Sequence, residues 1–312
     1  MALALDAPAK VNLHLAVLGR RADGYHEVDT VLHALALCDT LYAELQDPVD
    51  AASPISLHIR SETSTGLAVT ADPDNLVCRA ARAFLATAGL DVGVRFHLVK
   101  RIPAGGGLGG GSSDAAAALR LLNQLTGSPL GSLGLQTLAA GLGADVAFFL
   151  EGGTQRGRGV GADLSPLSAV GSWRFLLILP PVGTATPVVY QNLAAQLIAR
   201  SSADSIRGGP EVPDFSKLPL PMGFRNDLEA SALQLYPELA DLRRDLEELG
   251  FPHACLSGSG STFFVALSDP EQCGDAMARL QPLRARHGVK LLETGSGLPA
   301  PDEPRLVPFP GA

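Results

Sequence analysis

Six glycines fall within seven consecutive residues of this chain, at positions 105–111, where only Leu108 interrupts them. Because glycine has no Cβ, such a run can take turns closed to other residues and lets a ligand approach its backbone closely. The apolar stretch 94–99 before the run predicts a strand, and the alanine- and leucine-rich stretch 112–125 after it predicts a helix. A strand, a glycine loop and a helix in this order predict a phosphate cradle, because a helix start offers unpaired N–H groups and a positive dipole end.

The loop and its flanks supply the residues expected to hold a nucleotide. The hydroxyl groups of Ser112 and Ser113 can bond phosphate oxygens or a hydrated Mg²⁺, and Lys100 ahead of the loop can neutralise negative charge. The predicted nucleotide-binding residues are Lys100, Pro103, Ala104, Gly105, Gly106, Gly107, Leu108, Gly109, Gly110, Gly111, Ser112 and Ser113.

The glycine run has three other interpretations. A flexible linker is not expected between an apolar strand and an alanine-rich helix. Gly105, Gly107 and Gly110 satisfy the G-x-G-x-x-G spacing of dinucleotide-binding folds, but the match starts after residue 100, and no acidic residue ends a second strand about 20 residues on. A Walker loop is excluded because no lysine follows the last glycine. The run alone therefore leaves kinases and dehydrogenases open.

Composition narrows the classes of protein and of partner. The chain has 312 residues, 46% hydrophobic and 18% charged, which is enough to bury a core in two lobes. Its formal charge of −8 argues against a nucleic-acid partner, which needs clustered lysine and arginine. The four cysteines lack metal-ligand spacing, and the amino terminus lacks a signal-peptide pattern. No apolar run approaches the roughly 18 residues of a membrane span. We therefore expect a cytoplasmic protein with no membrane partner.

The first lobe is predicted to span residues 1–163. Apolar stretches at 3–17 and 28–45 predict strands on either side of a polar turn. The segment Asp-Pro-Asp-Asn at 72–75 is suited to cap the start of a helix that Gly89 ends.

The second lobe is predicted to span residues 164–297. Its strands alternate with helices, including one helix over 227–250, so the whole chain is expected to be α+β. Residues 201–221, which are polar and rich in Gly and Pro, predict a surface loop. The proline-rich tail 298–312 is expected to be extended or disordered.

Four motifs resemble those of the GHMP kinase superfamily, and within it the family of 4-diphosphocytidyl-2-C-methyl-D-erythritol kinases. They are PAKVNLHLAVLGRRADGYHEV at 8–28, PAGGGLGGGSSDAA at 103–116, GADVAFF at 143–149 and LSGSGST at 256–262. The resemblance implies a two-lobed fold of mixed sheets and helices with its active site in the cleft between the lobes. It also implies ATP with Mg²⁺ at the glycine loop. The phosphoryl acceptor would be the 2-hydroxyl of a cytidine-diphosphate-linked methylerythritol, in the non-mevalonate route to isoprenoid precursors.

The same resemblance assigns roles to single residues. Lys10 and Asp145 would be catalytic: Asp145 accepts or orients the proton of the substrate hydroxyl, and Lys10 favours the ionised carboxylate and the developing alkoxide. The family usually has proline after GADV, where this chain has Ala147, which implies a less rigid placement of Asp145. The metal ligands stay unassigned. The implied substrate-binding residues are Asn12, Tyr25, His26, Tyr190, Gly258, Ser259 and Gly260.

Two alternative functions stay open at this point. Another GHMP kinase, acting on mevalonate derivatives, homoserine or a sugar, would need no cytosine pocket, so the GYHE segment at 24–27 favours the cytidine-linked substrate. A catalytically silent, nucleotide-binding member is the alternative from another class, and the presence of both Lys10 and Asp145 argues against it. The sequence is compatible with a monomer or a homodimer.

Overall fold

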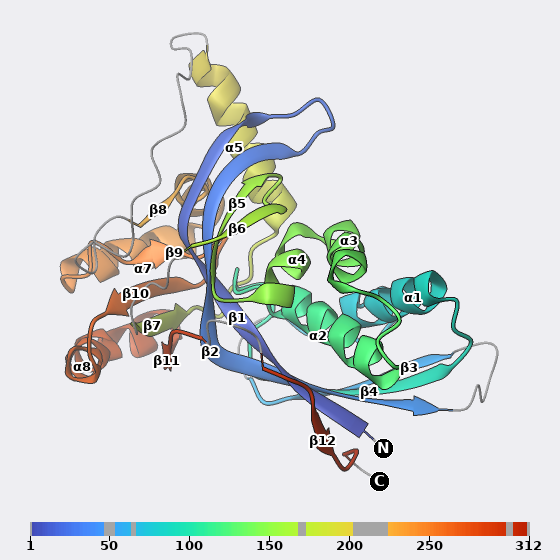
Figure 1. Ribbon diagram of the computed structural model, residues 1–312. Helices are drawn as coiled ribbons and strands as arrows, with labels where there is room; N and C mark the ends of the chain where they lie inside the picture. The colour runs from blue at the N-terminus through green and yellow to red at the C-terminus, as the bar shows by residue number, and fades with distance from the viewer. Residues whose placement is uncertain are drawn as a thin grey trace.

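A long antiparallel hairpin runs through the middle of the molecule (Figure 1). It consists of β1 (Ala2–Arg20) and β2 (His26–Gln46), which are buried along most of their length. The computed structural model describes residues 2–46, 54–63, 67–167, 173–201, 224–297 and 302–310.

The hairpin is the centre of an eight-stranded sheet. A continuous path runs β12-β1-β2-β4-β3, while β5 and β6 extend from β2, and β8 pairs with β1. Because β2 is long, it pairs with β5 through residues 28–33 and with β4 through residues 40–46. The other strands of this sheet are β3 (Ile55–Ser61), β4 (Gly93–Lys100), β5 (Thr154–Gly159), β6 (Asp163–Pro166), β8 (Arg225–Asn226) and β12 (Arg305–Val307).

Helices cover one face of this sheet (Figure 1). They are α1 (Leu76–Ala88), α2 (Gly110–Leu125), α3 (Ser132–Leu142) and α4 (Ala144–Glu151). Within the predicted capping segment 72–75, Asn75 is the N-cap of α1, and its side chain accepts the Val77 N–H at 2.9 Å. As predicted, left-handed Gly89 ends the helix. The alanine- and leucine-rich face of α2 packs on β1 and β2, so an apolar core fills the space between helices and sheet.

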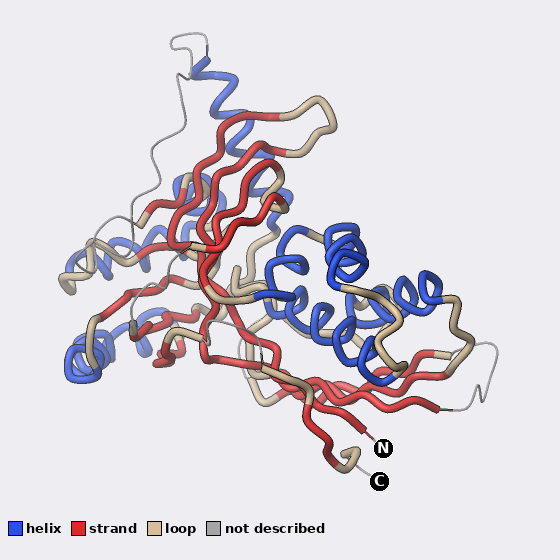
Figure 2. Tube along the Cα trace, viewed as in Figure 1, coloured by secondary structure: helices blue, strands red, loops and turns tan. Residues whose placement is uncertain are grey.

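A second sheet has four strands in the order β11-β7-β10-β9, and all its neighbouring pairs are antiparallel. Its strands are β7 (Arg174–Leu179), β9 (Cys255–Leu256), β10 (Phe263–Leu267) and β11 (Lys290–Gly295). Its helices are α5 (Thr186–Ser201), α6 (Glu229–Leu235), α7 (Pro237–Glu248) and α8 (Pro270–His287). In Figure 2, α1–α4 lie on one side of the hairpin, and α7 and α8 lie on the other. The α+β fold with two lobes is thus confirmed.

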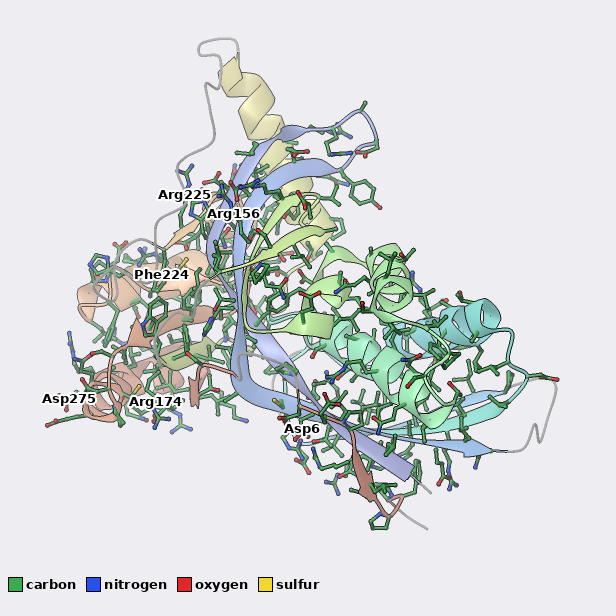
Figure 3. The ribbon with its side chains drawn as sticks, in the orientation of Figure 1. Asp6, Arg156, Arg174, Phe224, Arg225 and Asp275 are labelled. Carbon is green, nitrogen blue, oxygen red and sulfur yellow. The ribbon has the colours of Figure 1, made fainter. Side chains whose placement is uncertain are left out.

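Both lobes contact the hairpin. Asn226 of β8, the strand that pairs with β1, donates to the carbonyls of Leu256 and Gly258 at 2.7 and 2.6 Å. Arg156 and Arg225 lie beside the hairpin (Figure 3), where Arg156 pairs with Asp29 of β2 at 2.5 Å. The hairpin therefore fixes the two sides of the cleft relative to each other.

Several predicted elements need correction. The single helix over 227–250 is wrong, because the chain breaks at Tyr236 and Pro237 starts a new helix, where its missing N–H is not needed. Residues 202–221 of the predicted surface loop lie outside the described residues, and Ser201 ends α5.

None of the helices in the described ranges combines the length and the apolarity that crossing a membrane requires.

The described part of the tail agrees with expectation, whereas the expected lobe boundary falls within a strand. The described part of the tail is extended: β12 pairs with β1, and Arg305 donates to Asp6 (labelled in Figure 3) at 3.1 Å. The expected boundary at Asp163 falls on β6, which pairs with β5 of the larger sheet. We therefore propose a boundary between Pro166 and Arg174.

Candidate active site

The glycine run forms a loop between β4 and α2, which we call the phosphate loop (residues 103–109). Gly105, Gly107 and Gly109 have positive φ of 75°, 75° and 72°, a region that side chains disfavour. Helix α2 begins at Gly110, two residues earlier than predicted, so the last two glycines belong to its first turn. The loop is therefore a defined turn and not a flexible linker.

The phosphate loop presents unpaired donors. Helix α2 has Gly109 at its N-cap, with no side-chain cap bond, and the backbone N–H groups of residues 106–112 find no acceptor among the described residues. Unpaired N–H groups and the positive end of a 16-residue helix favour a bound anion. Ser112, in the first turn of α2, adds its hydroxyl to the same cavity.

A second glycine loop, residues 257–262, contacts the phosphate loop from the other lobe. Ser257 Oγ donates to the Gly107 carbonyl at 2.9 Å, and the Thr262 N–H donates to the Gly106 carbonyl at 3.2 Å. Two of the predicted substrate-binding residues, Gly258 and Ser259, line the cavity. The third, Gly260, does not line it, and its N–H closes a turn on the Ser257 carbonyl. The cleft between the lobes is thus bounded by two glycine loops in direct contact.

Lys10 and Asp145 face each other across this cleft. Lys10 Nζ of β1 lies 3.7 Å from Asp145 Oδ2, in the first turn of α4. The Lys10 side chain is 5% exposed and that of Asp145 is 38% exposed, so the carboxylate is the partner open to a substrate. Asp145 does not cap its helix, because Gly143 occupies the N-cap. The two predicted catalytic residues are therefore brought together on the cavity wall.

A chain of hydrogen bonds behind Lys10 fixes its ammonium. Lys10 Nζ donates to Asn12 Oδ1 at 2.7 Å, and Asn12 Nδ2 donates to Thr30 Oγ1 at 2.9 Å. The Thr30 hydroxyl in turn donates to the His14 carbonyl at 2.7 Å, so Asn12 has one orientation that satisfies both partners. Asn12 was predicted to face the substrate, and it does line the cavity, but Thr30 was not predicted. A threonine on a strand gives no sequence signal of such a role.

The cavity between the loops has a volume of about 700 Å³. Its wall includes Lys10, Asn12, Asp145 and the phosphate loop, together with residues 67–76, which the sequence did not assign to the site. Leu67 of that segment donates its N–H to the Ala104 carbonyl at 2.9 Å, and its side chain lies close to Gly105.

A second hollow of about 640 Å³ adjoins the first and shares Val28, Val160, Thr186 and Tyr190 with it. Tyr25 and His26 line it, and Tyr25 is 67% exposed at the hairpin turn. The rings of His26 and Tyr190 lie 5.0 Å apart at 31°. Burial, with the Asp145 charge, raises the pKa of Tyr190 to about 12, and burial, with nearby Arg20, lowers the pKa of His26. Both rings are therefore neutral near pH 7.

Two predicted nucleotide-binding side chains do not face the cavity. Lys100 is 3% exposed, and its ammonium is paired with Asp39 and Asp114 beneath the loop. Direct contact of Lys100 with phosphate is therefore a wrong prediction, because both carboxylates hold its charge inside the protein. Ser113 is also buried, one residue past the last residue of α2 that lines the cavity, Ser112.

Known proteins share this fold. Family models described as "GHMP kinases N terminal domain" and "GHMP kinases C terminal" match residues 75–153 and 211–282. A crystal structure of a homoserine kinase from Cytophaga hutchinsonii has a TM-score of 0.67 at 18% identity over 98% of this chain and 97% of that one, a likeness of fold alone. Fold and cleft together define the class of GHMP kinases.

Proteins with higher sequence identity to this chain share the name of one particular kinase. The 4-diphosphocytidyl-2-C-methyl-D-erythritol kinase of Granulibacter bethesdensis is 40% identical over 296 residues, which cover 94% of this chain and 93% of that protein. The kinase of the same name from Salinispora tropica is 38% identical over 294 residues, which cover 90% of each. A crystal structure of 4-(cytidine 5'-diphospho)-2C-methyl-D-erythritol kinase has a TM-score of 0.68 at 34% identity over 94% of this chain and 99% of that one. The chain belongs to the 4-diphosphocytidyl-2-C-methyl-D-erythritol kinase family.

Proposed function

We propose that this protein transfers the terminal phosphoryl group of ATP to the 2-hydroxyl of 4-diphosphocytidyl-2-C-methyl-D-erythritol, a step toward isoprenoid precursors by the non-mevalonate route. Membership of the family supports the assignment of this substrate. The observation that carries the chemistry is the Lys10–Asp145 pair, 3.7 Å apart on the wall of the cavity that the phosphate loop also lines.

The proposed roles follow from these positions. The exposed Asp145 carboxylate accepts or orients the proton of the attacking hydroxyl. Lys10, held by Asn12, places its ammonium beside the oxygen that becomes negative. The unpaired N–H groups of residues 106–112 receive phosphate oxygens. Most of the catalysis would then come from positioning and charge stabilisation, as in other phosphoryl transfers.

Mg²⁺ fits the oxygen donors of this wall. The hydroxyl of Ser112 and the carboxylate of Asp145 both line the cavity, and Mg²⁺ prefers oxygen ligands, of which phosphates and water commonly supply most. We propose these two side chains as its protein ligands. When bound, the ion would offset the charge of the terminal phosphates.

The adjoining hollow is the proposed cytidine site. Tyr25, His26 and Tyr190 offer flat rings on which a base can stack. A base inserted between two rings needs about 7 Å between them, twice a stacking contact of ~3.5 Å, so the 5.0 Å between His26 and Tyr190 is too short. The base would therefore stack on the outer face of this pair, or one ring would turn aside on binding.

The proposal is tested by offering the protein ATP and Mg²⁺ with one acceptor at a time. We expect ADP release with the cytidine-linked methylerythritol, and none above background with free methylerythritol or mevalonate. ADP release confined to either of those two acceptors would refute the substrate assignment.

The catalytic assignment is tested separately. Asp145→Asn keeps the shape of the side chain but cannot accept the proton, so turnover should fall by roughly 10²–10⁴-fold. ADP binding, measured by calorimetry without Mg²⁺, should stay within a few-fold of the original, because the phosphate loop is untouched. Full turnover by Asp145→Asn would show that Asp145 is neither base nor essential orienting group.

The cysteines bear on where in the cell the enzyme is located. Cys38, Cys78, Cys255 and Cys273 are all free, and burial, first among the causes, raises the pKa of each thiol. Free thiols support a reducing compartment, and we propose the cytoplasm.

A further inference from the structure

Three charged side chains from three elements meet beneath the phosphate loop. Asp39 belongs to β2, Lys100 ends β4 and Asp114 lies in α2, and all three are at most 3% exposed. Lys100 Nζ donates to Asp114 Oδ2 at 2.8 Å and also to Asp39 Oδ2. Charges so deeply buried are costly unless they are paired and hydrogen-bonded, so a cluster of this kind needs a reason.

The contacts of Asp39 extend to the backbone at the start of the loop. Asp39 Oδ1 accepts the N–H groups of Arg101 and Ile102 at 2.5 and 2.9 Å. These two residues lead into the phosphate loop, and Asp114 follows it in the first turns of α2. One ammonium and two carboxylates therefore link the point where the chain enters the loop to the point where it leaves.

We propose that Asp39, Lys100 and Asp114 form a clamp that holds the two ends of the phosphate loop at the separation a nucleotide's phosphates require. The three are positioning residues, since none of them lines the cavity. Lys100 Nζ comes within 3.1 Å of the place where a Cβ of Gly110 would stand, so the clamp lies directly under the turn that begins α2. The inference rests on the proposed function only in that a nucleotide binds this loop.

The physical need for a clamp follows from the composition of the loop. Glycine loses more backbone freedom than other residues when it is ordered, so a loop with glycine at 105, 106, 107 and 109 is costly to hold in one shape. If that ordering took place on binding, its cost would weaken affinity, whereas a loop fixed beforehand avoids the cost.

Charge within the clamp supports the same role. Burial, with the Asp39 charge added, raises the pKa of Asp114 to about 7, although Lys100 acts in the opposite direction. Burial opposes the charge of Lys100 as well, but Asp114 and Asp39 outweigh it, and the pKa of Lys100 is raised. The ammonium therefore stays protonated at neutral pH and can hold both carboxyl groups.

The test compares two changes at Asp114 with a control in the same helix. Asp114→Leu removes the acceptor of Lys100, whereas Asp114→Asn keeps an oxygen there and should preserve the clamp. Leu119→Ala is the control, because Leu119 is buried in α2 but lies outside the clamp, so it weakens the helix packing without touching the loop.

The readouts are the Kd for ADP by calorimetry and the separate KM values for ATP and for the alcohol. We expect Asp114→Leu to raise the Kd for ADP and the KM for ATP by roughly 10- to 100-fold, with the KM for the alcohol changed less than threefold. Asp114→Asn and Leu119→Ala should leave nucleotide affinity within about threefold. If Asp114→Leu does not fold, Asp114→Ser, whose shorter side chain cannot span the same gap, replaces it in the same comparison.

Two results would overturn the clamp. One is unchanged ADP affinity in a folded Asp114→Leu or Asp114→Ser protein. The other is an equal loss of ADP affinity in Leu119→Ala, which would mean that any weakening of α2 suffices. Since ADP binding needs no acceptor substrate, a wrong acceptor assignment in the proposed function would leave this test intact.

Discussion

Replacing Gly107 by alanine tests how closely the two glycine loops are packed. A Cβ built at Gly107 would lie 2.0 Å from the Ser257 carbonyl oxygen and 2.8 Å from that of Gly260, and both are backbone atoms. Gly105 is a matched control, because it has the same φ of 75°. A Cβ at Gly105 would first meet the end of the Leu67 side chain, at 2.8 Å, which can rotate away.

The expected magnitudes follow from these neighbours. Both variants place a side chain in the left-handed region, which costs about 1–2 kcal/mol. Gly107→Ala must also displace backbone of the other lobe, and forced overpacking of this kind costs a further ~1–3 kcal/mol. Gly107→Ala should therefore lower the free energy of unfolding by about 2–5 kcal/mol, and Gly105→Ala by about 1–2 kcal/mol.

Urea denaturation without ligand measures the difference in unfolding free energy between the two variants. Circular dichroism and the fluorescence of the single tryptophan, Trp173, monitor the unfolding. The displaced second glycine loop should also lose the bonds of Ser257 and Thr262 to the phosphate loop, so kcat should fall more in Gly107→Ala than in Gly105→Ala. Equal destabilisation of the two variants would refute the reasoning, since it would mean that the loops do not press on each other at Gly107.

Three further changes test other parts of the site. Thr30→Val removes the bond that orients Asn12, so kcat should fall by roughly tenfold with little change in either KM, and an unchanged kcat would mean that Asn12 needs no support. Tyr190→Ala should raise the KM for the cytidine-linked alcohol more than Tyr190→Phe does, and equal effects would argue against stacking. Asp114 binds a proton in the folded state up to a pH of about 7 but only to about 3.8 when unfolded, so stability should fall as pH rises between these values. Asp114 contributes at most ~1.4 kcal/mol per pH unit to this fall in the free energy of unfolding. In urea titrations at several pH values, the Asp114→Asn protein should not show this contribution.

Local signals in the sequence were enough for most of the elements. The caps of α1 act over a few residues: Asn75 lies in the predicted capping segment 72–75, and Gly89 ends the helix as predicted. The break between α6 and α7 had a local signal too, in Pro237, but the helical pattern on either side of it concealed the break. The hairpin of β5 and β6 was not predicted, because its stretch is rich in glycine and becomes a strand only by pairing with β2.

The active site was predictable to the extent that its residues fall within motifs. Lys10, Asp145 and the phosphate loop were assigned to the candidate site in this way, and the structure brings them together in one cleft. Lys100 was misassigned because its partner Asp39 lies 61 residues away along the chain, and no spacing rule connects them. The part of residues 67–76 in the cavity wall was missed for the same reason, since only the fold brings that segment against Ala104.

Different neighbours lie close to the different glycines of the run. A side chain at Gly107 would strike the second lobe, one at Gly109 would meet Phe149 and Lys10 within 3.0 Å, and one at Gly110 would meet Ile102 and Lys100 within about 3.1 Å. Gly111 has only Leu76 nearby, at 3.7 Å, which is an ordinary contact. Close packing from several sides, and not a need for flexibility, therefore explains the glycines at 107, 109 and 110. Lys10 approaches the loop at Gly109 and Lys100 of the proposed clamp approaches it at Gly110, so close packing requires glycine at both positions before any phosphate binds.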